Sequence, residues 1–133
     1  MNPFLVILLA AMASWLFGAV WYTALSRPYQ RAQGLNPDDC KDQKMPMVPL
    51  AVAFLGAVVM SAVMYEILSY LGLVGGVPHA AQAGLTIGLG LLFTSVLVNN
   101  MFQGKPFLLT LIDGGHWTLV LAIQAMVIEL LRS

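Results

Sequence analysis

Charged residues are scarce in this chain, and their scarcity excludes most soluble folds. Only 9% of the 133 residues are charged, whereas ordinary soluble domains carry about 25%. Six basic and six acidic residues leave a formal net charge of zero, so the chain has no basic surplus with which to bind nucleic acid. A soluble protein of this composition could not cover its surface with polar groups, and no nucleic-acid partner is expected.

Cysteine is almost absent as well. The single Cys40 excludes an intrachain disulfide and any metal or dithiol site built from several cysteines. The two histidines, His79 and His116, lie at levels that differ by well over about 10 Å along the predicted helices, which is too far for axial ligands of one haem iron. The chain also lacks a Ser/His/Asp arrangement, a glycine-rich phosphate loop and zinc-ligand spacing, so neither a metal nor a cofactor is expected.

Long apolar runs fill most of what remains. Hydrophobic residues make up 59% of the chain, and a bilayer span needs about 20 largely apolar residues. Four runs reach that length, at about residues 3–25, 47–71, 79–102 and 106–131. The sequence therefore predicts an all-α integral membrane protein, a single domain of residues 1–133 in which two helical hairpins form a four-helix bundle.

Basic residues gather on one side of the predicted membrane. With four spans, the loop of residues 26–46 and the turn of residues 103–105 share one side and contain every lysine and arginine except Arg132. Because basic residues in short loops stay in the cytoplasm, we expect both termini outside and these two loops inside.

Local signals shape the loops. Asn36 as the N-cap and Pro37 at the first helical position predict a short cytoplasmic helix that runs to about Lys44. Residues 72–78 form a tight, uncharged connection between the second and third spans. Gly104 can end the third span, and Pro106 can open the fourth, so these two spans are predicted to form a close hairpin.

Polar residues are unusually frequent in the fourth span. Asp113, His116 and Gln124 fall within one narrow sector of the helix. An aspartate at the centre of a span costs about 2.5 to 3.5 kcal/mol, so it should face the protein interior or a hydrated cavity and have a partner there.

The third span supplies the expected partner face. Gly84 and Gly88 are four residues apart, a spacing that lets helices approach closely in lipid; a homodimer seam is the alternative use. Counted from the Gly104 turn, Asp113 is level with Ser95, Val120 with Gly88, and Gln124 with Gly84. We therefore expect the polar sector of the fourth span to face the third, and Asp113 to bond to some combination of Ser95, Asn99 and His116, with Asn99 and Asn100 closing the cytoplasmic end.

Each polar residue has a structural and a functional interpretation. Asp113 is as consistent with a hydrogen-bonded anchor as with a functional carboxylate. His116 could relay protons or pair with Asp113. Asn99 and Asn100 lie near the membrane interface, which favours helix capping and interhelical bonds.

Four short motifs together resemble a known family. They are GAVWY at residues 18–22, GLNPDD at 34–39, NNMFQGKP at 99–106 and LIDGGH at 111–116. The chain resembles a bacterial family of small four-span membrane proteins catalogued only as a domain of unknown function. The resemblance implies a multi-pass protein of the bacterial inner membrane. It marks Trp21, Tyr22, Gly104, Pro106 and Gly115 as family-motif positions, and it supplies no reaction.

Two classes of function remain open. Tight loops favour a non-enzymatic accessory or structural protein, embedded in the lipid bilayer as a homo-oligomer or beside other membrane subunits. The alternative is a dimeric small-solute or proton-coupled transporter that uses Asp113 and His116, with Asn99 and Trp21 lining the path. A lipid-modifying enzyme is a distant third possibility, because the chain has no evident nucleophile.

Overall fold

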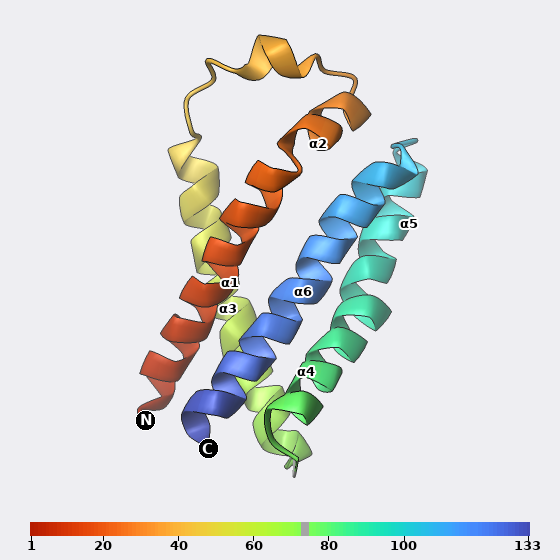
Figure 1. Cartoon of the computed structure of the whole chain (residues 1–133). Helices are drawn as coiled ribbons and strands as arrows, with labels where there is room; N and C mark the ends of the chain where they lie inside the picture. Colours follow the sequence, from red (N-terminus) through yellow and green to blue (C-terminus); the bar gives the residue numbers. More distant parts are fainter. Residues whose placement is uncertain (73–74) are drawn as a thin grey trace.

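The computed structural model describes residues 1–72 and 75–133, and within these ranges the chain is helical and contains no strand (Figure 1). Three spans are single helices: α1 (Pro3–Ala24), α3 (Met47–Leu71) and α6 (Phe107–Arg132). The third span runs from Gly76 to Phe102, and all four are long and apolar enough to cross a membrane. The predicted all-α protein with four membrane-length helices is confirmed.

Local signals at the helix ends, among them the predicted Gly104 and Pro106, explain several boundaries. Asn2 caps α1 by accepting a hydrogen bond from the amide of Phe4 at 2.8 Å. Gly72 follows α3 with a φ of 54°, and Gly104 follows the third span with a φ of 65°. Glycine adopts these left-handed values without the steric cost that other residues incur. Pro106 then precedes α6 as its N-cap residue, so the close turn between the last two spans forms as expected.

The first loop differs from its prediction. The predicted helix there is only a short 3-10 helix, η1 (Pro37–Cys40), and it ends four residues before Lys44. Its cap is the expected one, because Asn36 accepts from the amide of Asp38 at 3.1 Å. A second helix, α2 (Ser26–Ala32), was not predicted; Pro28 lies in its first turn, where its missing N–H costs no helical bond.

The connection between α3 and the third span is shorter than predicted. The third span begins at Gly76 instead of His79, and Gly75 and Gly76 both have positive φ. Residues 73–74 of the predicted connection lie outside the described residues.

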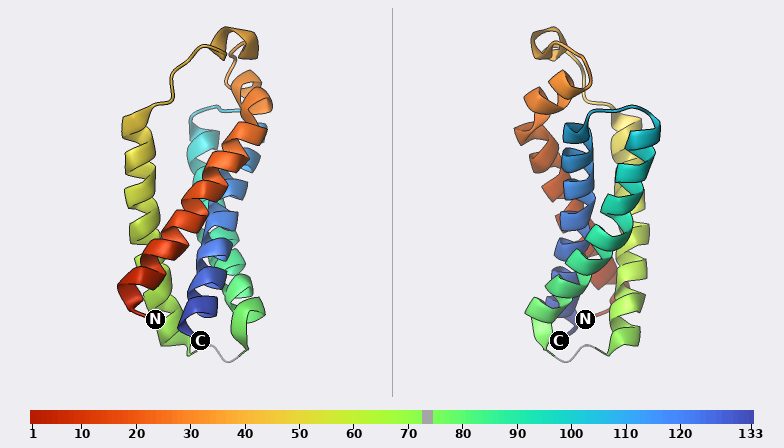
Figure 2. Two further views of the ribbon diagram at one scale, coloured as in Figure 1. Left: turned by 60° about the vertical axis from the view of Figure 1, so that its left-hand side comes forward. Right: turned by 90° about the vertical axis from the view of Figure 1, so that its right-hand side faces the viewer.

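Helix α6 occupies the centre of the protein. It packs against α1, α3 and the third span, while α1 also packs against α3. In the most apolar stretch of each span, 56% of the residues are buried in α6, against 28% in α1, 17% in α3 and 11% in the third span. Figure 2 shows α3 diverging from the other helices toward the first loop, whereas both termini lie at the opposite end. The core cluster of buried apolar residues comprises Val6, Ala10, Met64, Leu68, Ala80, Leu121, Ala125 and Ile128.

The third span changes its helical geometry midway. It consists of α4 (Gly76–Ile87), a π-helical turn η2 (Gly88–Phe93) and α5 (Thr94–Phe102). Gly88 touches α6 before the turn, and Phe93 packs on Gly114 of α6 after it. In a regular α-helix, residues five apart point about 140° away from each other, but a π turn adds one residue. The π turn therefore keeps one face of the third span against α6.

The predicted close approach at Gly84 and Gly88 is confirmed as contact within the monomer. A Cβ at Gly84 would lie 2.7 Å from Ala122 Cα, and one at Gly88 would lie 2.6 Å from Thr118 Cα. Both neighbouring atoms are backbone, so no side-chain rotation could relieve the overlap. The levels differ from the prediction by about half a turn, because Gly88 lies opposite Thr118 instead of Val120.

Candidate functional site

The polar sector of α6 faces α1, which corrects the expected contact with the third span. Asp113 Oδ1 accepts a hydrogen bond from the Tyr22 hydroxyl at 2.6 Å. The expected partners Ser95 and Asn99 are exposed, and the Ser95 hydroxyl donates to the carbonyl of Leu91 in its own helix. His116, the third expected partner, makes no hydrogen bond to Asp113 among the described residues.

The row of α6 that meets the third span explains this correction. It consists of small residues four apart, and Gly114 and Thr118 carry the contacts with Phe93 and Gly88. Neighbouring residues in a helix point about 100° apart, so packing Gly114 against the third span turns Asp113 toward α1. Small side chains allow the closest approach of two helices in lipid, and this contact therefore decides the direction of the carboxylate.

Trp21 makes a second bond between α1 and α6. Its indole Nε1–H donates to the carbonyl oxygen of Ile112 at 3.0 Å. Gly115 lies beneath the indole, where an added Cβ would be 3.4 Å from the ring. Trp21 and Tyr22 thus each donate a hydrogen bond to α6, and together they hold the end of α1 against it.

His116 lies inside a ring of aromatic side chains. Its imidazole is stacked on Phe17 with centroids 6.2 Å apart, and lies 4.9 Å from the ring of Tyr22 and 4.7 Å from that of Trp117. The residue is only 8% exposed, and its Nδ1 has no hydrogen-bond partner in the part of the chain that the structure describes. Gly18 makes room for the ring, because a Cβ there would be 2.8 Å from Nε2.

Tyr29 of α2 extends the cluster toward the first loop. Its ring packs edge-on against Tyr22 with centroids 5.4 Å apart. Burial raises the pKa of Tyr29 above its ordinary value, and the negative charge of Asp113 raises it further. The Tyr29 hydroxyl therefore stays protonated and can act as a donor beside the carboxylate.

Gln124 and Asn100 serve as interhelical joints away from this cluster. Gln124 is fully buried, and its Nε2 donates to Ser14 Oγ and to the carbonyl of Ala57, both at 3.0 Å. One side chain thereby joins α1, α3 and α6. Asn100 is also buried and donates to Thr110 Oγ1 at 3.1 Å, so it bonds between helices as its structural interpretation expected.

The structure thus gathers some of the sequence-derived candidates and separates others. Asp113, His116, Trp21, Tyr22 and Gly115 meet at the contact between α1 and α6. Gln124 bonds to α1 and α3 elsewhere in the core, and Asn100 of α5 bonds to Thr110 of α6. Gly104 and Pro106 lie in the turn between α5 and α6.

Sequence reasoning missed two further members of the cluster, Phe17 and Tyr29. Phe17 could have been found, because it and Trp21 are four residues apart, next to the pair Gly18 and Tyr22 on the same side of α1. No local signal indicated Tyr29, whose place depends on the unpredicted helix α2.

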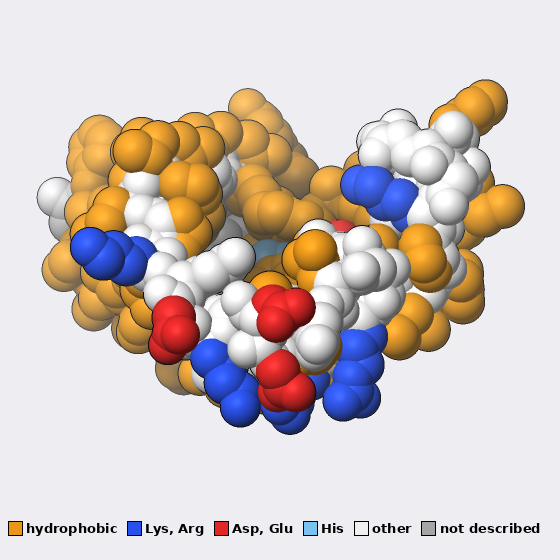
Figure 3. All heavy atoms as spheres, turned by 90° about the horizontal axis from the view of Figure 1, so that it is seen from above, with side chains coloured by type: hydrophobic (Ala, Val, Ile, Leu, Met, Phe, Trp, Pro, Cys, Tyr) orange, Lys and Arg blue, Asp and Glu red, His pale blue; other side chains and the backbone are white. Residues whose placement is uncertain are grey.

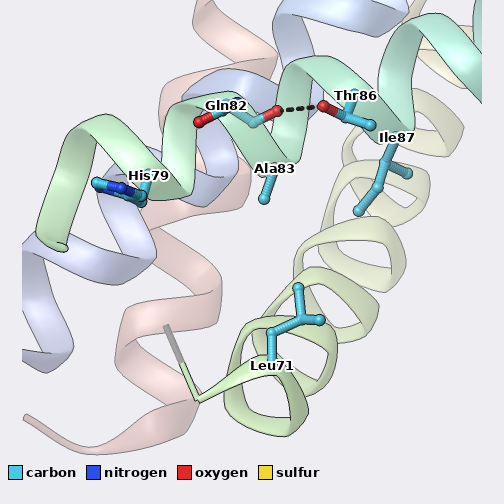
Figure 4. Close-up of a pocket in the computed structure, with 6 residues that line it drawn as sticks. All are labelled: Leu71, His79, Gln82, Ala83, Thr86 and Ile87. Carbon is cyan, nitrogen blue, oxygen red and sulfur yellow. Dashed lines mark hydrogen bonds between the residues drawn. The ribbon is translucent and has the colours of Figure 1, made fainter. Parts of the chain in front are cut away.

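Two surface grooves lie elsewhere. One, of about 300 Å³, lies between Leu71 of α3 and α4; Figure 4 shows Ala83 and Ile87 pointing toward α3, with His79 farther along α4. His79 Nδ1 donates to the carbonyl of Gly75 at 3.1 Å, at the end of the protein opposite the first loop. The other groove, of about 330 Å³, is in the first loop between α2 and η1. Neither groove is lined by Asp113 or His116.

Comparison with known proteins assigns a family. The family described as "Protein of unknown function (DUF1761)" matches residues 5–129, which is nearly the whole chain, and the chain therefore belongs to it. This confirms the resemblance to a family of unknown function. No curated protein and no solved structure matches the chain.

Proposed function

We propose that this member of the DUF1761 family is a non-enzymatic accessory or structural protein, which acts as a homo-oligomer or as a subunit of a larger membrane assembly. The proposal rests on one observation, which is that polar side chains in the spans form hydrogen bonds between helices. Tyr22, Trp21 and Gln124 each donate a hydrogen bond to another helix. In lipid, interhelical bonds and close packing replace the hydrophobic force that assembles soluble proteins, so these groups are engaged in holding the spans together.

The outer spans support the oligomeric part of the proposal. Most of the surface of α3 and of the third span is not covered by the rest of the chain. The third span also directs a polar side chain outward, because Gln82 is exposed. Polar groups within spans usually face protein or water instead of lipid tails. A neighbouring subunit along this span would supply such an environment.

Location and orientation complete the proposal. We place the chain in the bacterial inner membrane with both termini outside, because the basic residues concentrate in the first loop and the turn between α5 and α6. A membrane-impermeant thiol reagent should label Cys40 in inverted vesicles and not in intact cells. A Cys40→Ser, Ser133→Cys variant is the matched control and should give the opposite pattern. Labelling of Cys40 in intact cells would overturn the orientation.

Reconstitution tests the function itself. Native mass spectrometry of the protein released from nanodiscs should find more than one chain per particle, or a membrane partner in fixed stoichiometry after mild cross-linking in cells. Proteoliposomes should show the same proton and solute permeability with wild type and with Asp113→Asn. A particle with a single chain and no partner would contradict the proposal.

A dimeric small-solute or proton-coupled transporter is the second candidate. The observation that favours it is the buried His116 Nδ1 without a hydrogen-bond partner among the described residues, close to the partly buried Asp113. Asp113→Asn preserves size and most hydrogen bonds while removing titration. If this variant folds normally and abolishes a pH-dependent flux, the accessory role fails and transport takes its place.

A further inference from the structure

Helix α6 carries two acidic side chains, and they differ in how their charge is balanced. Glu129 is 7% exposed and is paired with Arg132 at 2.7 Å. Asp113 is partly buried, and none of the described lysine or arginine residues forms an ion pair with it. The cation that neutralises Glu129 thus has no counterpart at Asp113.

The neighbours of Asp113 are neutral donors and aromatic rings. Tyr22 donates to Oδ1, but a hydroxyl stabilises a carboxylate without cancelling its charge. His116 follows three residues later, on the same side of the helix. With a rise of about 1.5 Å per residue, Asp113 and His116 lie about 9 and 14 Å beyond the start of α6, well inside the span.

The surrounding elements bring few other titratable groups to the site. Tyr22 comes from α1 and Tyr29 from α2. The loop-facing half of α3, residues 47–58, and residues 88–102 of the third span contain none. In the first loop, Arg27 and Lys41 are paired with Asp38 at 3.1 and 3.4 Å. Asp113 and His116 are therefore the two groups whose protonation can set the charge of the site.

We propose that Asp113 and His116 together bind one proton, which takes the role beside Asp113 that Arg132 has beside Glu129. An ionised carboxylate beside a neutral imidazole gives the site a charge of minus one, and two protons give plus one. Only the state with one proton is neutral. An unbalanced charge inside a membrane span is costly, so the neutral state is favoured.

The surroundings of the site are compatible with the proton on His116 and with the proton on Asp113. A protonated imidazole would be a cation surrounded by the rings of Phe17, Tyr22 and Trp117, an arrangement that stabilises positive charge. The proton on Asp113 would instead give a neutral carboxyl group still bonded to Tyr22. In either case the site holds one proton and has no net charge.

The proton can reach the site from the face of the protein that carries the first loop. Asp113 is partly buried and has Tyr29 nearby, on the side of the first loop. Seen from this face, the protein is hollowed between masses of apolar side chains, with a histidine visible in the hollow and charged side chains gathered over the loop at its edge (Figure 3). The site therefore exchanges its proton with the side of the membrane on which the first loop lies.

Spectroscopy of the full-length protein in nanodiscs tests the inference. Infrared difference spectra measure the protonated carboxyl group that disappears in Asp113→Asn, and ¹⁵N NMR measures the protonation of both histidines, with His79→Gln assigning the second signal. At neutral pH, the fraction of chains with a protonated Asp113 carboxyl group and the fraction with a doubly protonated His116 ring should add up to one. In His116→Phe, which replaces the imidazole with another ring, the proton should be found on Asp113.

Glu129→Gln is the matched control, because Glu129 already has its cation. This variant should remove no protonated carboxyl signal at neutral pH. An ionised Asp113 beside a neutral His116 in the wild type, or an ionised Asp113 in His116→Phe, would overturn the inference. The measurement does not depend on the accessory role, which is tested by oligomeric state, so either proposal can fail alone.

Discussion

The two ends of α6 hold an acidic side chain in different ways. At the end near the termini, Glu129 and Arg132 lie three residues apart on one helix, and Arg132 also reaches the carbonyl of Leu68 on α3 at 3.4 Å. At the loop end, Asp113 depends on Tyr22 of α1, 91 residues away in the sequence. One charge is balanced within a helix, and the other is accommodated between helices.

This difference teaches where the protein can respond to its surroundings. The pair of Glu129 and Arg132 survives small helix movements, because both partners move together. The cluster around Asp113 exists only while α1 is docked on α6, since Phe17, Trp21 and Tyr22 all come from α1. Protonation at the loop end is therefore linked to helix docking, and a change in either one changes the other.

The largest effect is expected at the contact between α6 and the third span, because this contact supports both ends of α6. Gly88→Leu would place a side chain 2.6 Å from the backbone of Thr118, and overpacking of this kind costs about 3 kcal/mol of unfolding free energy. Unfolding titrations in mixed micelles measure the loss. Gly90→Leu is the control, because open space surrounds Gly90, and it should leave stability nearly unchanged. If Gly88→Leu disrupts only an oligomer, the glycine contact belongs to a subunit seam.

A second substitution should leave the acidic side chain at each end of α6 without a paired cation. Arg132→Gln leaves Glu129 buried without its cation, which costs about 2 kcal/mol at neutral pH once the partial exposure of Arg132 is allowed for. The loss should shrink in the double variant Glu129→Gln, Arg132→Gln, because it leaves no uncompensated charge buried in the span. Unfolding titrations of the single and double variants check this, with Arg31→Gln in the exposed first loop as the control. An equal loss in the single and double variants would show that charge balance is not the cause.

Sequence reasoning reached the spans and turns because their signals are local. Gly104 and Pro106 act through their own backbone preferences, and an apolar run predicts a span wherever it lies. The partner of Asp113 could not be predicted in the same way. One residue along a helix turns the side chain by about 100°, and the facing of α6 was decided by the contact of Gly114 and Thr118 with the third span. The π turn and the position of Tyr29 likewise arise from packing between distant segments.

A third, smaller effect is expected from the hydroxyl that links α1 to Asp113. Tyr22→Phe keeps the aromatic packing on His116 and removes the 2.6 Å bond. A hydrogen bond to a charged or shared-proton group is worth about 1.5 kcal/mol, so stability should fall by about that amount. Tyr70→Phe is the matched control, because Tyr70 is 85% exposed, and it should cause no loss. An unchanged stability of Tyr22→Phe would mean that Asp113 contributes nothing to docking α1.

The smallest effect is expected to have the opposite sign. An added methyl at Gly115 would lie 3.4 Å from the Trp21 ring, which is ordinary contact, whereas one at Gly18 would lie 2.8 Å from His116 Nε2. Alanine is favoured over glycine inside a helix by about 0.5 to 1 kcal/mol. Gly115→Ala should therefore stabilise the protein by about 0.5 kcal/mol, while Gly18→Ala should destabilise it by displacing His116. If Gly115→Ala is stable but alters the protonation of Asp113 and His116, the glycine serves the site and not the packing. If it destabilises the protein as strongly as Gly18→Ala, the contact between Trp21 and α6 is tighter than the 3.4 Å separation indicates.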